Sequence, residues 1–368
     1  MDKICNLLWN HVRVHVDGKV LPCCQFDYLV PGSIKDIPDV TDGIEAAFSS
    51  EYFNTVRRKM LNGERIPECH KCMTDEDSGL VSMRTEFNKL FTETDVPKIR
   101  YIETALSTHC NLACRMCNET FSSKWFQYKN PKTKVDTSVN SATLTYYNSD
   151  LSELERIKLV GGEPMLDRNH ITFLKKMFGL SKTPEEISLH YHTNGTVKPT
   201  EKTLSFWRKA KEVEITFSID GIGKINEILR PPHKWKTIVD NINLIKSLDD
   251  INLKLNIHSV VSVLNIKHIE NIIQFAFNDM GLTEPDQLTF DLLYYPDHLS
   301  VLNTEPSYKQ EIIDFVKENY ISYDEELVDS VISQMMASKP DKVFSKSEII
   351  DIEKLHTYFS NSELSKIL

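Results

Sequence analysis

The sequence predicts an α/β protein in which a parallel sheet, covered by helices, forms a partial barrel of six strand–helix units. Between residues 96 and 297, strand-like apolar segments alternate with amphipathic helical stretches, a pattern typical of right-handed βαβ crossovers. All eight cysteines precede residue 118. Residues 1–95 therefore suggest a small cysteine-rich β-hairpin and helix module, and residues 298–368 a C-terminal helical extension.

Composition excludes several classes of protein. The chain has 368 residues and a formal net charge of −10, which argues against general nucleic-acid binding. No run of about 18 apolar residues is present, so no membrane span is predicted. The N-terminus lacks the pattern of a signal peptide, and we expect a cytoplasmic protein. Cysteines stay reduced there, so their clustering points to metal binding or catalysis rather than to disulfides.

The N-terminal module has few predicted elements. Alternating Val12, Val14 and Val16, the turn Asp17-Gly18 and the following Val20-Leu21 predict a hairpin. A short helix is expected over Glu51–Leu61. A Cys-x-x-Cys loop then follows at Cys69–Cys72. Because the module is poor in apolar residues, we expect a bound metal centre to stabilise it.

The remaining elements follow from periodicity. The expected barrel strands are Arg100–Ala105, Arg156–Val160, Ile187–His192, Glu214–Ile219, Lys254–Val263 and Gln287–Tyr294. The helical stretches between them are Ile171–Phe178, Thr200–Lys211, Trp235–Leu248 and Ile266–Phe277. The C-terminal extension should contain helices over Tyr308–Asn319, Glu325–Met336 and Ile349–Phe359.

The densest motif lies directly after the first barrel strand and has the spacing Cys110-x3-Cys114-x2-Cys117. Three thiolates on one short loop can hold three irons of a 4Fe-4S cube and leave the fourth iron open to a small molecule. A zinc site is the alternative, and it would need His109 or a distant residue as the fourth ligand. The loop follows a strand end, where the active sites of βα barrels lie.

This motif resembles that of the radical S-adenosylmethionine (SAM) superfamily, whose cysteine loop follows the first strand of a partial (β/α)6 barrel. The resemblance implies that Cys110, Cys114 and Cys117 are catalytic cluster ligands and that SAM chelates the open iron. Met116 stands where many members have an aromatic residue near the adenine.

The resemblance also implies a set of SAM-binding residues at later strand ends. Gly161, Gly162 and Glu163 match the glycine-rich motif that binds the SAM amino group. Thr193 and Asn194 match a threonine-asparagine-glycine turn, and Ser218 should reach the ribose. The further candidates are Asp220 as a second contact, Arg230 against the SAM carboxylate, and Val261 and Asn265 at the adenine pocket.

The N-terminal cysteines Cys5, Cys23, Cys69 and Cys72 supply four separated ligands. Cys24 is adjacent to Cys23, and neighbours on a strand point to opposite faces, so one of the two should bind. The arrangement resembles the SPASM/twitch auxiliary-cluster module, which implies a second 4Fe-4S cluster with Cys23 as the ligand. Such modules usually follow the barrel, whereas here the module precedes it. A zinc ribbon remains an alternative.

The expected activity is reductive cleavage of SAM to a 5′-deoxyadenosyl radical that abstracts hydrogen from a substrate, with an electron donor such as flavodoxin or ferredoxin. A peptide or protein is the first choice of substrate, and a sugar, nucleoside or other small metabolite is the alternative. A non-catalytic zinc-binding interaction protein is a rival from a different class. Candidate residues facing substrate are Tyr191, His192, His258, Asp291, Tyr294 and Tyr295.

Overall fold

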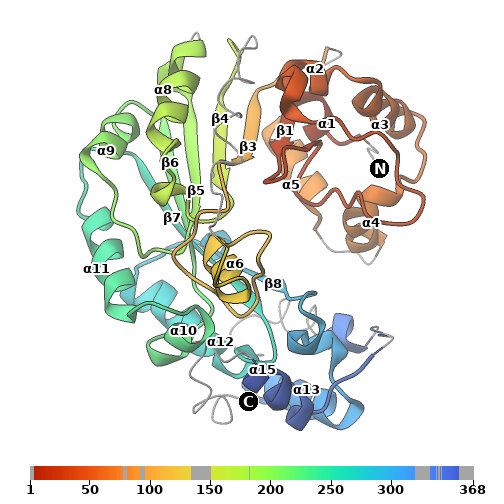
Figure 1. Ribbon diagram of the computed structural model, residues 1–368, viewed down its shortest axis with the longest axis vertical. Helices are drawn as coiled ribbons and strands as arrows, with labels where there is room; N and C mark the ends of the chain where they lie inside the picture. The colour runs from red at the N-terminus through yellow and green to blue at the C-terminus, as the bar shows by residue number, and fades with distance from the viewer. Residues whose placement is uncertain are drawn as a thin grey trace.

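The computed structural model of the chain describes residues 4–77, 81–91, 96–133, 151–181, 183–319, 332–336, 338, 340 and 342–355. Within these ranges, eight strands form one sheet in the order β2-β1-β3-β4-β5-β6-β7-β8 (Figure 1). The strands are β1 His11–Val14, β2 Val20–Leu21, β3 Tyr101–Ala105, β4 Arg156–Val160, β5 Ser188–Thr193, β6 Glu212–Ser218, β7 Leu253–Val261 and β8 Leu288–Leu292. Strands β3 to β8 are all parallel, which confirms the predicted α/β partial barrel.

The predicted hairpin is present, but it does not stand apart from the barrel. Gly18 turns the chain with a φ of +89°, a conformation that glycine adopts without a steric penalty. Strand β2 pairs antiparallel with β1, and β1 pairs parallel with β3. The N-terminal module therefore adds two strands to the edge of the barrel sheet, a pairing that the sequence analysis did not anticipate.

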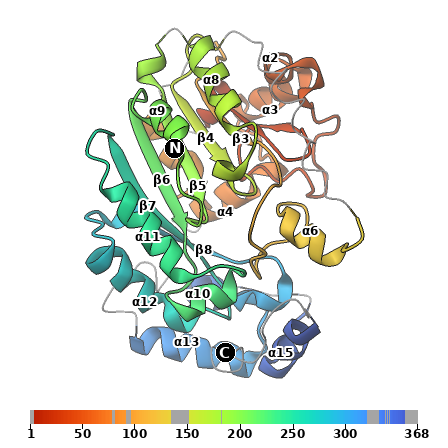
Figure 2. The same ribbon diagram turned by 60° about the vertical axis from the view of Figure 1, so that its left-hand side comes forward.

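Helices lie around the sheet on its outer face, after the strand ends and in the N-terminal and C-terminal parts of the chain (Figures 1 and 2). The outer face of the barrel is covered by α8 His170–Leu180, α9 Glu201–Trp207 and α11 Trp235–Lys246. Shorter helices follow the cysteine loop and the later strands: α6 Ser123–Lys129, α10 Lys224–Leu229 and α12 Ile269–Gln274. The N-terminal helices beside β1 are α1 Leu7–Asn10, α2 Ile44–Phe48, α3 Glu51–Leu61, α4 His70–Asp77 and α5 Met83–Leu90.

The C-terminal helices α13 Pro306–Asn319 and α15 Lys346–Leu355 lie near α10 and α12 in both views. The helix expected over Glu325–Met336 is described only at 332–336, where it is helical, and residues 325–331 and 356–359 of the expected helices lie outside the described residues. The expected helix Ile266–Phe277 is present, with a mixed geometry. It begins as a 3₁₀ helix at Ile266–His268, continues as α12 and ends as a π-helix at Phe275–Asp279.

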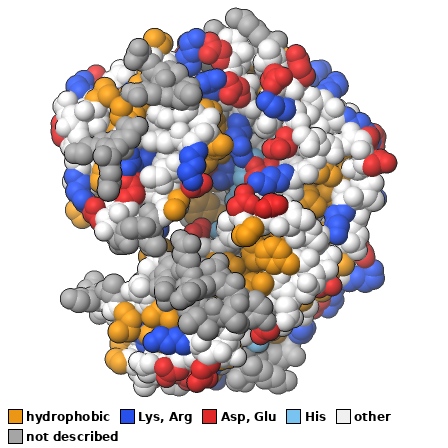
Figure 3. Space-filling view, turned by 180° about the vertical axis from the view of Figure 1, so that it is seen from behind, with side chains coloured by type: hydrophobic (Ala, Val, Ile, Leu, Met, Phe, Trp, Pro, Cys, Tyr) orange, Lys and Arg blue, Asp and Glu red, His pale blue; other side chains and the backbone are white. Residues whose placement is uncertain are grey.

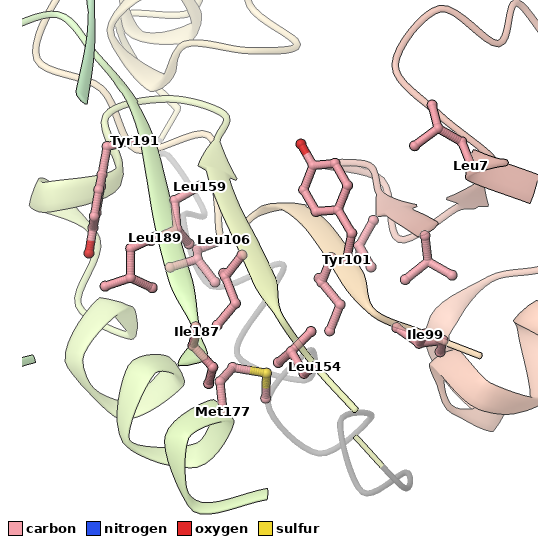
Figure 4. Close-up of a cluster of buried hydrophobic side chains, with 14 of the residues drawn as sticks. Leu7, Ile99, Tyr101, Leu106, Leu154, Leu159, Met177, Ile187, Leu189 and Tyr191 are labelled. Carbon is pink, nitrogen blue, oxygen red and sulfur yellow. The ribbon is translucent and has the colours of Figure 1, made fainter. Parts of the chain in front are cut away.

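The largest core lies between the sheet and its outer helices. Side chains at alternate positions of the strands point outward, because successive residues of a strand face opposite sides of the sheet. Leu159, Leu189 and Ile215 are completely buried in this layer. Figure 4 shows Met177 of α8 directed toward Leu154 and Ile187 at the base of the strands. The intervening residues face the barrel interior, and they include most of the strands' charged residues.

No helix in the described ranges combines the length and apolar character needed to cross a bilayer.

Candidate active site

The cysteine loop between β3 and α6 has no regular structure, and side chains at the start of α6 hold it in place. The amide of Cys110 donates to Ser123 Oγ at 3.1 Å. Ser122 caps the helix through the amide of Trp125, and its hydroxyl donates to the carbonyl of Leu112 at 2.7 Å. Trp125 Nε1 donates to the carbonyl of Cys114 at 2.7 Å. Together these bonds satisfy backbone groups that a loop would otherwise leave unpaired.

The segment after α10 holds the other side of the loop. The amide of Ala113 donates to the carbonyl of Pro231 at 2.6 Å, and the amide of Arg115 donates to the carbonyl of Leu229 at 2.8 Å. Cys114 lies between these two attachment points. Its sulfur is 3.7 Å from Arg230 Nη1, so the predicted Arg230 lies beside a predicted cluster ligand.

The glycines at the end of β4 pack directly under the loop. Gly162 N donates to the carbonyl of Ser107, and Glu163 N donates to the carbonyl of His109 at 2.7 Å. A Cβ at position 162 would lie 2.3 Å from the carbonyl oxygen of His109. Gly161 has a φ of +107°, which L side chains rarely adopt. Both positions therefore require glycine for steric reasons.

Burial raises the pKa values of all three thiols of the loop. Desolvation raises the pKa of Cys110 to about 12, and the neighbouring Cys114 adds to this rise. The pKa of Cys117 is also raised, by burial and by charges on Cys114 and Cys110. The thiols are therefore protonated without metal, and iron binding would release their protons.

Glu163 lies beside the loop with its carboxylate held from β5. Thr193 Oγ1 donates to Glu163 Oε1 at 2.9 Å, and the amide of Asn194 donates to Oε2 at 2.8 Å. Glu163 is 1% exposed, and burial raises its pKa to about 7 despite these bonds. Asn194 Nδ2 donates to Asn111 Oδ1 at 3.0 Å, which ties the same turn to the cysteine loop.

Asp220 and Arg230, which the sequence analysis treated as separate contacts, form a buried pair. Arg230 Nε donates to Asp220 Oδ2 at 2.6 Å, and the amide of Val260 donates to Oδ1 at 2.8 Å. Asn265 Nδ2 donates to the carbonyls of Asp220 and Val260. Asp220 and Asn265 thus orient Arg230 and the end of β7.

The other predicted cofactor contacts have different positions. Ser218 is half-buried at the end of β6, paired in register with His258 on the inner face. Met116 is half-buried against an apolar cluster that includes Leu229 and the C-terminal helices. Val261 belongs to the interior of that cluster and has no exposed surface. Val261 shares one face of β7 with Ile257, and Met116 packs against the same cluster. The place of Val261 at the adenine pocket stays a prediction.

The N-terminal cysteines surround a separate cavity of about 340 Å³. Cys5, Cys23, Cys69 and Cys72 line it together with Phe26, Met60, Met83 and Arg84. Burial raises the pKa of Cys5 to about 11, and the pKa of Cys23 is raised by burial and by all the other cysteines of the module. Cys24 is not among the lining residues. Its sulfur lies 3.5 Å from Met83 Sδ, and its pKa is raised by burial and by the charge of Glu103.

Comparison with known proteins gives the family. The Radical SAM superfamily model matches residues 104–276. A second model, the SPASM iron–sulfur cluster-binding domain, matches residues 5–73. The chain contains a radical SAM domain and, before it, a SPASM domain. Among curated proteins, none matches it.

Similar solved structures are radical SAM proteins with low identity to this chain. Native anSMEcpe with bound AdoMet is 18% identical, with 71% of this chain and 67% of that chain covered and a TM-score of 0.44. Streptococcus suis SuiB bound to S-adenosylmethionine is 13% identical, with coverage of 61% and 45% and a TM-score of 0.36. SuiB bound to the precursor peptide SuiA is 12% identical, with coverage of 77% and 60% and a TM-score of 0.40. The chain spans about half of SuiB, and these likenesses describe the fold alone.

The cofactors of this radical SAM protein are 4Fe-4S clusters and SAM. The two zinc alternatives are therefore set aside. The donor chemistry fits, because each of the two cysteine groups offers buried thiols at one location. Within the described part of the chain, no three His, Cys, Asp or Glu side chains have the arrangement of a single-ion site. A cube spreads its thiolates over different irons, so they stand farther apart than the ligands of one ion.

The inner face of the barrel carries a row of charged and polar residues that the sequence analysis missed. Glu103, Lys158, His190 and Glu214 lie opposite one another in register across β3 to β6. Lys158 Nζ is 3.5 Å from Glu103 Oε2, and Arg13 Nε is 3.3 Å from Oε1. The signal was available, because charges at every second position of an apolar strand indicate a polar interior face.

The predicted substrate-facing residues occupy three kinds of position: the barrel interior, the exposed segment after β8 and the apolar core. His192 lies in the interior, with its ring centroid 4.8 Å from that of His190 and 6.1 Å from that of His258. His258 Nε2 is 3.0 Å from Asp291 Oδ2. Figure 3 shows a hollow on this side of the molecule, with histidine and charged side chains around it. Tyr294 and Tyr295, just after β8, are exposed.

The expectation for Tyr191 was wrong. Its side chain points away from the interior toward the helices (Figure 4) and is completely buried. Tyr191 Oη hydrogen-bonds His170 Nε2 at 2.9 Å. Tyr191 lies one residue from His192, and strand alternation therefore places it on the opposite face of the sheet.

Replacing Gly162 with alanine should displace the cysteine loop, since the new Cβ would overlap the backbone of His109. We expect loss of most iron from the site of this loop, measured as iron and sulfide content after anaerobic reconstitution. Gly179→Ala is the matched control, because Gly179 is exposed on α8 with no atom within 4 Å of its added Cβ. Equal iron content in the two variants would contradict the steric argument.

Proposed function

We propose that this radical SAM enzyme binds one cluster and SAM at Cys110, Cys114 and Cys117, and a second cluster at Cys5, Cys23, Cys69 and Cys72. We further propose that it abstracts hydrogen from a peptide or protein held in the barrel interior. The observation that carries this proposal is the polar interior row of Glu103, Lys158, His190 and Glu214. It lies on the same strands whose ends lead into the cysteine loop and Glu163.

When bound, the cluster and SAM supply a 5′-deoxyadenosyl radical by reductive cleavage, with an electron from a donor such as flavodoxin or ferredoxin. The protein binds and orients SAM. In this proposal Glu163 accepts the ammonium group, and Arg230 pairs with the carboxylate, a task suited to its planar fork. Asp220 keeps Arg230 in the required orientation. Burial of these groups excludes water, which strengthens each electrostatic contact.

The hollow in Figure 3 supports an extended substrate. Lys71 of α4 influences the pKa of Asp291 and of Tyr294, so α4 lies near the end of β8. A peptide segment can cross an open hollow, whereas small-molecule sites usually enclose most of their ligand. The exposed Tyr294 and Tyr295 provide apolar surface at the rim.

A small metabolite is the second candidate, favoured by one observation. The Glu103–Lys158 pair is largely buried inside the barrel, with side-chain exposures of 3% and 15%. Buried polar groups of this kind suit recognition of hydroxyl or amino groups on a compact substrate.

The proposed function is tested by reducing the anaerobically reconstituted enzyme with dithionite in the presence of SAM and candidate substrates, and measuring 5′-deoxyadenosine by mass spectrometry. Wild type should form it, and a peptide substrate should change in mass and raise the rate. Cys114→Ala should form none, because one cluster ligand is missing. Equal formation by wild type and Cys114→Ala would refute the assignment of the loop.

The two adjacent cysteines give a matched comparison for the second cluster. Cys24→Ala should keep about eight irons per chain, the content of two four-iron cubes. Cys23→Ala should fall toward about four, because Cys23 lines the cavity and Cys24 does not. Iron loss in Cys24→Ala with retention in Cys23→Ala would reverse the assignment.

SAM affinity should depend on pH through Glu163. Its pKa is about 7 without SAM, so below neutral pH it must lose a proton before it can pair with an ammonium group. The affinity for SAM should be about tenfold weaker at pH 6 than at pH 8. One pH unit below its pKa, only about one Glu163 carboxyl in ten is ionised. Anaerobic calorimetry measures this, and Glu163→Gln should bind weakly without that pH dependence. A pH-independent wild-type affinity would contradict the assigned role.

A further inference from the structure

The C-terminal helix α15 reaches the cysteine loop through an ion pair inside the protein. Glu353 on α15 pairs with Arg115, which lies between Cys114 and Met116. The two side chains are 1% and 2% exposed. Charges so deeply buried are retained where they are paired, because removing one partner leaves an uncompensated charge in a medium of low dielectric.

Arg115 also connects the helix to the segment that supports Cys114. Its Nε donates to the carbonyl of Ile228 at 3.0 Å, and its amide donates to the carbonyl of Leu229. The next residue, Arg230, reaches the sulfur of Cys114. The guanidinium of Arg115 therefore contacts both α15 and the end of α10, while the backbone of Arg115 is part of the cysteine loop.

Glu353 has a further contact on the opposite side. Its Oε1 is 2.8 Å from His298 Nε2, in the turn Asp297–Leu299 that follows β8. Glu353 thus joins the cysteine loop to the end of the last barrel strand. A second C-terminal helix, α13, has its own apolar anchors, since Ile312 and Val316 are buried in the apolar cluster. At the surface, Glu311 of α13 pairs with Lys267 and with Lys346 on α15.

We propose that α15 is part of the SAM site, with Glu353 as a positioning residue that holds Arg115 and thereby sets the geometry of Cys114 and Arg230. This inference rests on the proposed function for its consequence, which is SAM binding. The other part of the inference, that Glu353 holds Arg115 and the loop in the metal-free protein, is independent of that function. A C-terminal extension that only covered the barrel end would have no need of a buried charge in the cluster loop.

Two variants separate positioning from simple stability. Glu353→Gln keeps the size of the side chain and removes its charge. The double variant Arg115→Met/Glu353→Met replaces the pair with apolar side chains, an exchange that buried ion pairs often tolerate without loss of stability. Glu311→Gln is the matched control, because it breaks the surface ion pairs of α13 with Lys267 and with Lys346 on α15 and does not touch the loop.

The first measurement is hydrogen exchange of the loop amides of residues 111–117 in the full-length metal-free protein, at a temperature where all variants are folded. We expect exchange about tenfold faster in Glu353→Gln and in the double variant, and wild-type exchange in Glu311→Gln. The second measurement is the KM for SAM during 5′-deoxyadenosine formation by the reconstituted enzyme. It should rise about tenfold in the same two variants and stay unchanged in Glu311→Gln.

Wild-type loop exchange and KM in the double variant would overturn the proposal, since the loop would then keep its geometry without the pair. Equal changes in Glu311→Gln would also overturn it, because general loosening of the extension would account for the effect. If the wild type forms no 5′-deoxyadenosine, the proposed function fails, while the exchange experiment on the metal-free protein still decides the positioning role.

Discussion

The contact between the end of β4 and the cysteine loop is the constraint on which the rest of the site depends. The backbone of Gly162 lies against the carbonyl of His109 so closely that no side chain fits between them. Two backbone hydrogen bonds cross this contact, from Gly162 and Glu163 to the loop. A loop without regular structure thereby acquires a defined path. The same contact places the Glu163 carboxyl beside Cys110, whose pKa its charge helps to raise.

The parallel sheet arranges the rest of the chemistry around this contact. Each strand ends at the same edge, so Glu163, Asn194 and Asp220 converge although they come from three different βα units. The direct pairing of β1 with β3 extends the sheet into the N-terminal module. The two cysteine groups therefore follow strands of one continuous sheet, with Cys23 after β2 and Cys110 after β3.

Local patterns in the sequence predicted the strands, the outer helices and the cysteine loop, because alternation and ligand spacing are properties of short segments. The error at Tyr191 arose because its position along the strand decides which face of the sheet its side chain occupies. Tyr191 points to the helices, whereas its neighbour His192 points inward. Motif matching named the residues near a strand end without fixing which face each side chain occupies.

Contacts between distant segments could not be predicted from the sequence. The pairing of β1 with β3, the Asp220–Arg230 ion pair and the ion pair between Arg115 and Glu353 depend on how elements meet in three dimensions. The choice between Cys23 and Cys24 for the cavity also required the structure, since the two residues are adjacent and only Cys23 lines the cavity.

We propose that the cluster on Cys110, Cys114 and Cys117 binds SAM directly. The decisive measurement is electron–nuclear double resonance of the reduced enzyme with SAM that carries ¹⁵N in its amino group. We expect a ¹⁵N hyperfine coupling to one of the two clusters, because an iron without a cysteine ligand is open to chelation. Two iron–sulfur signals that show no coupling to the labelled SAM would contradict it.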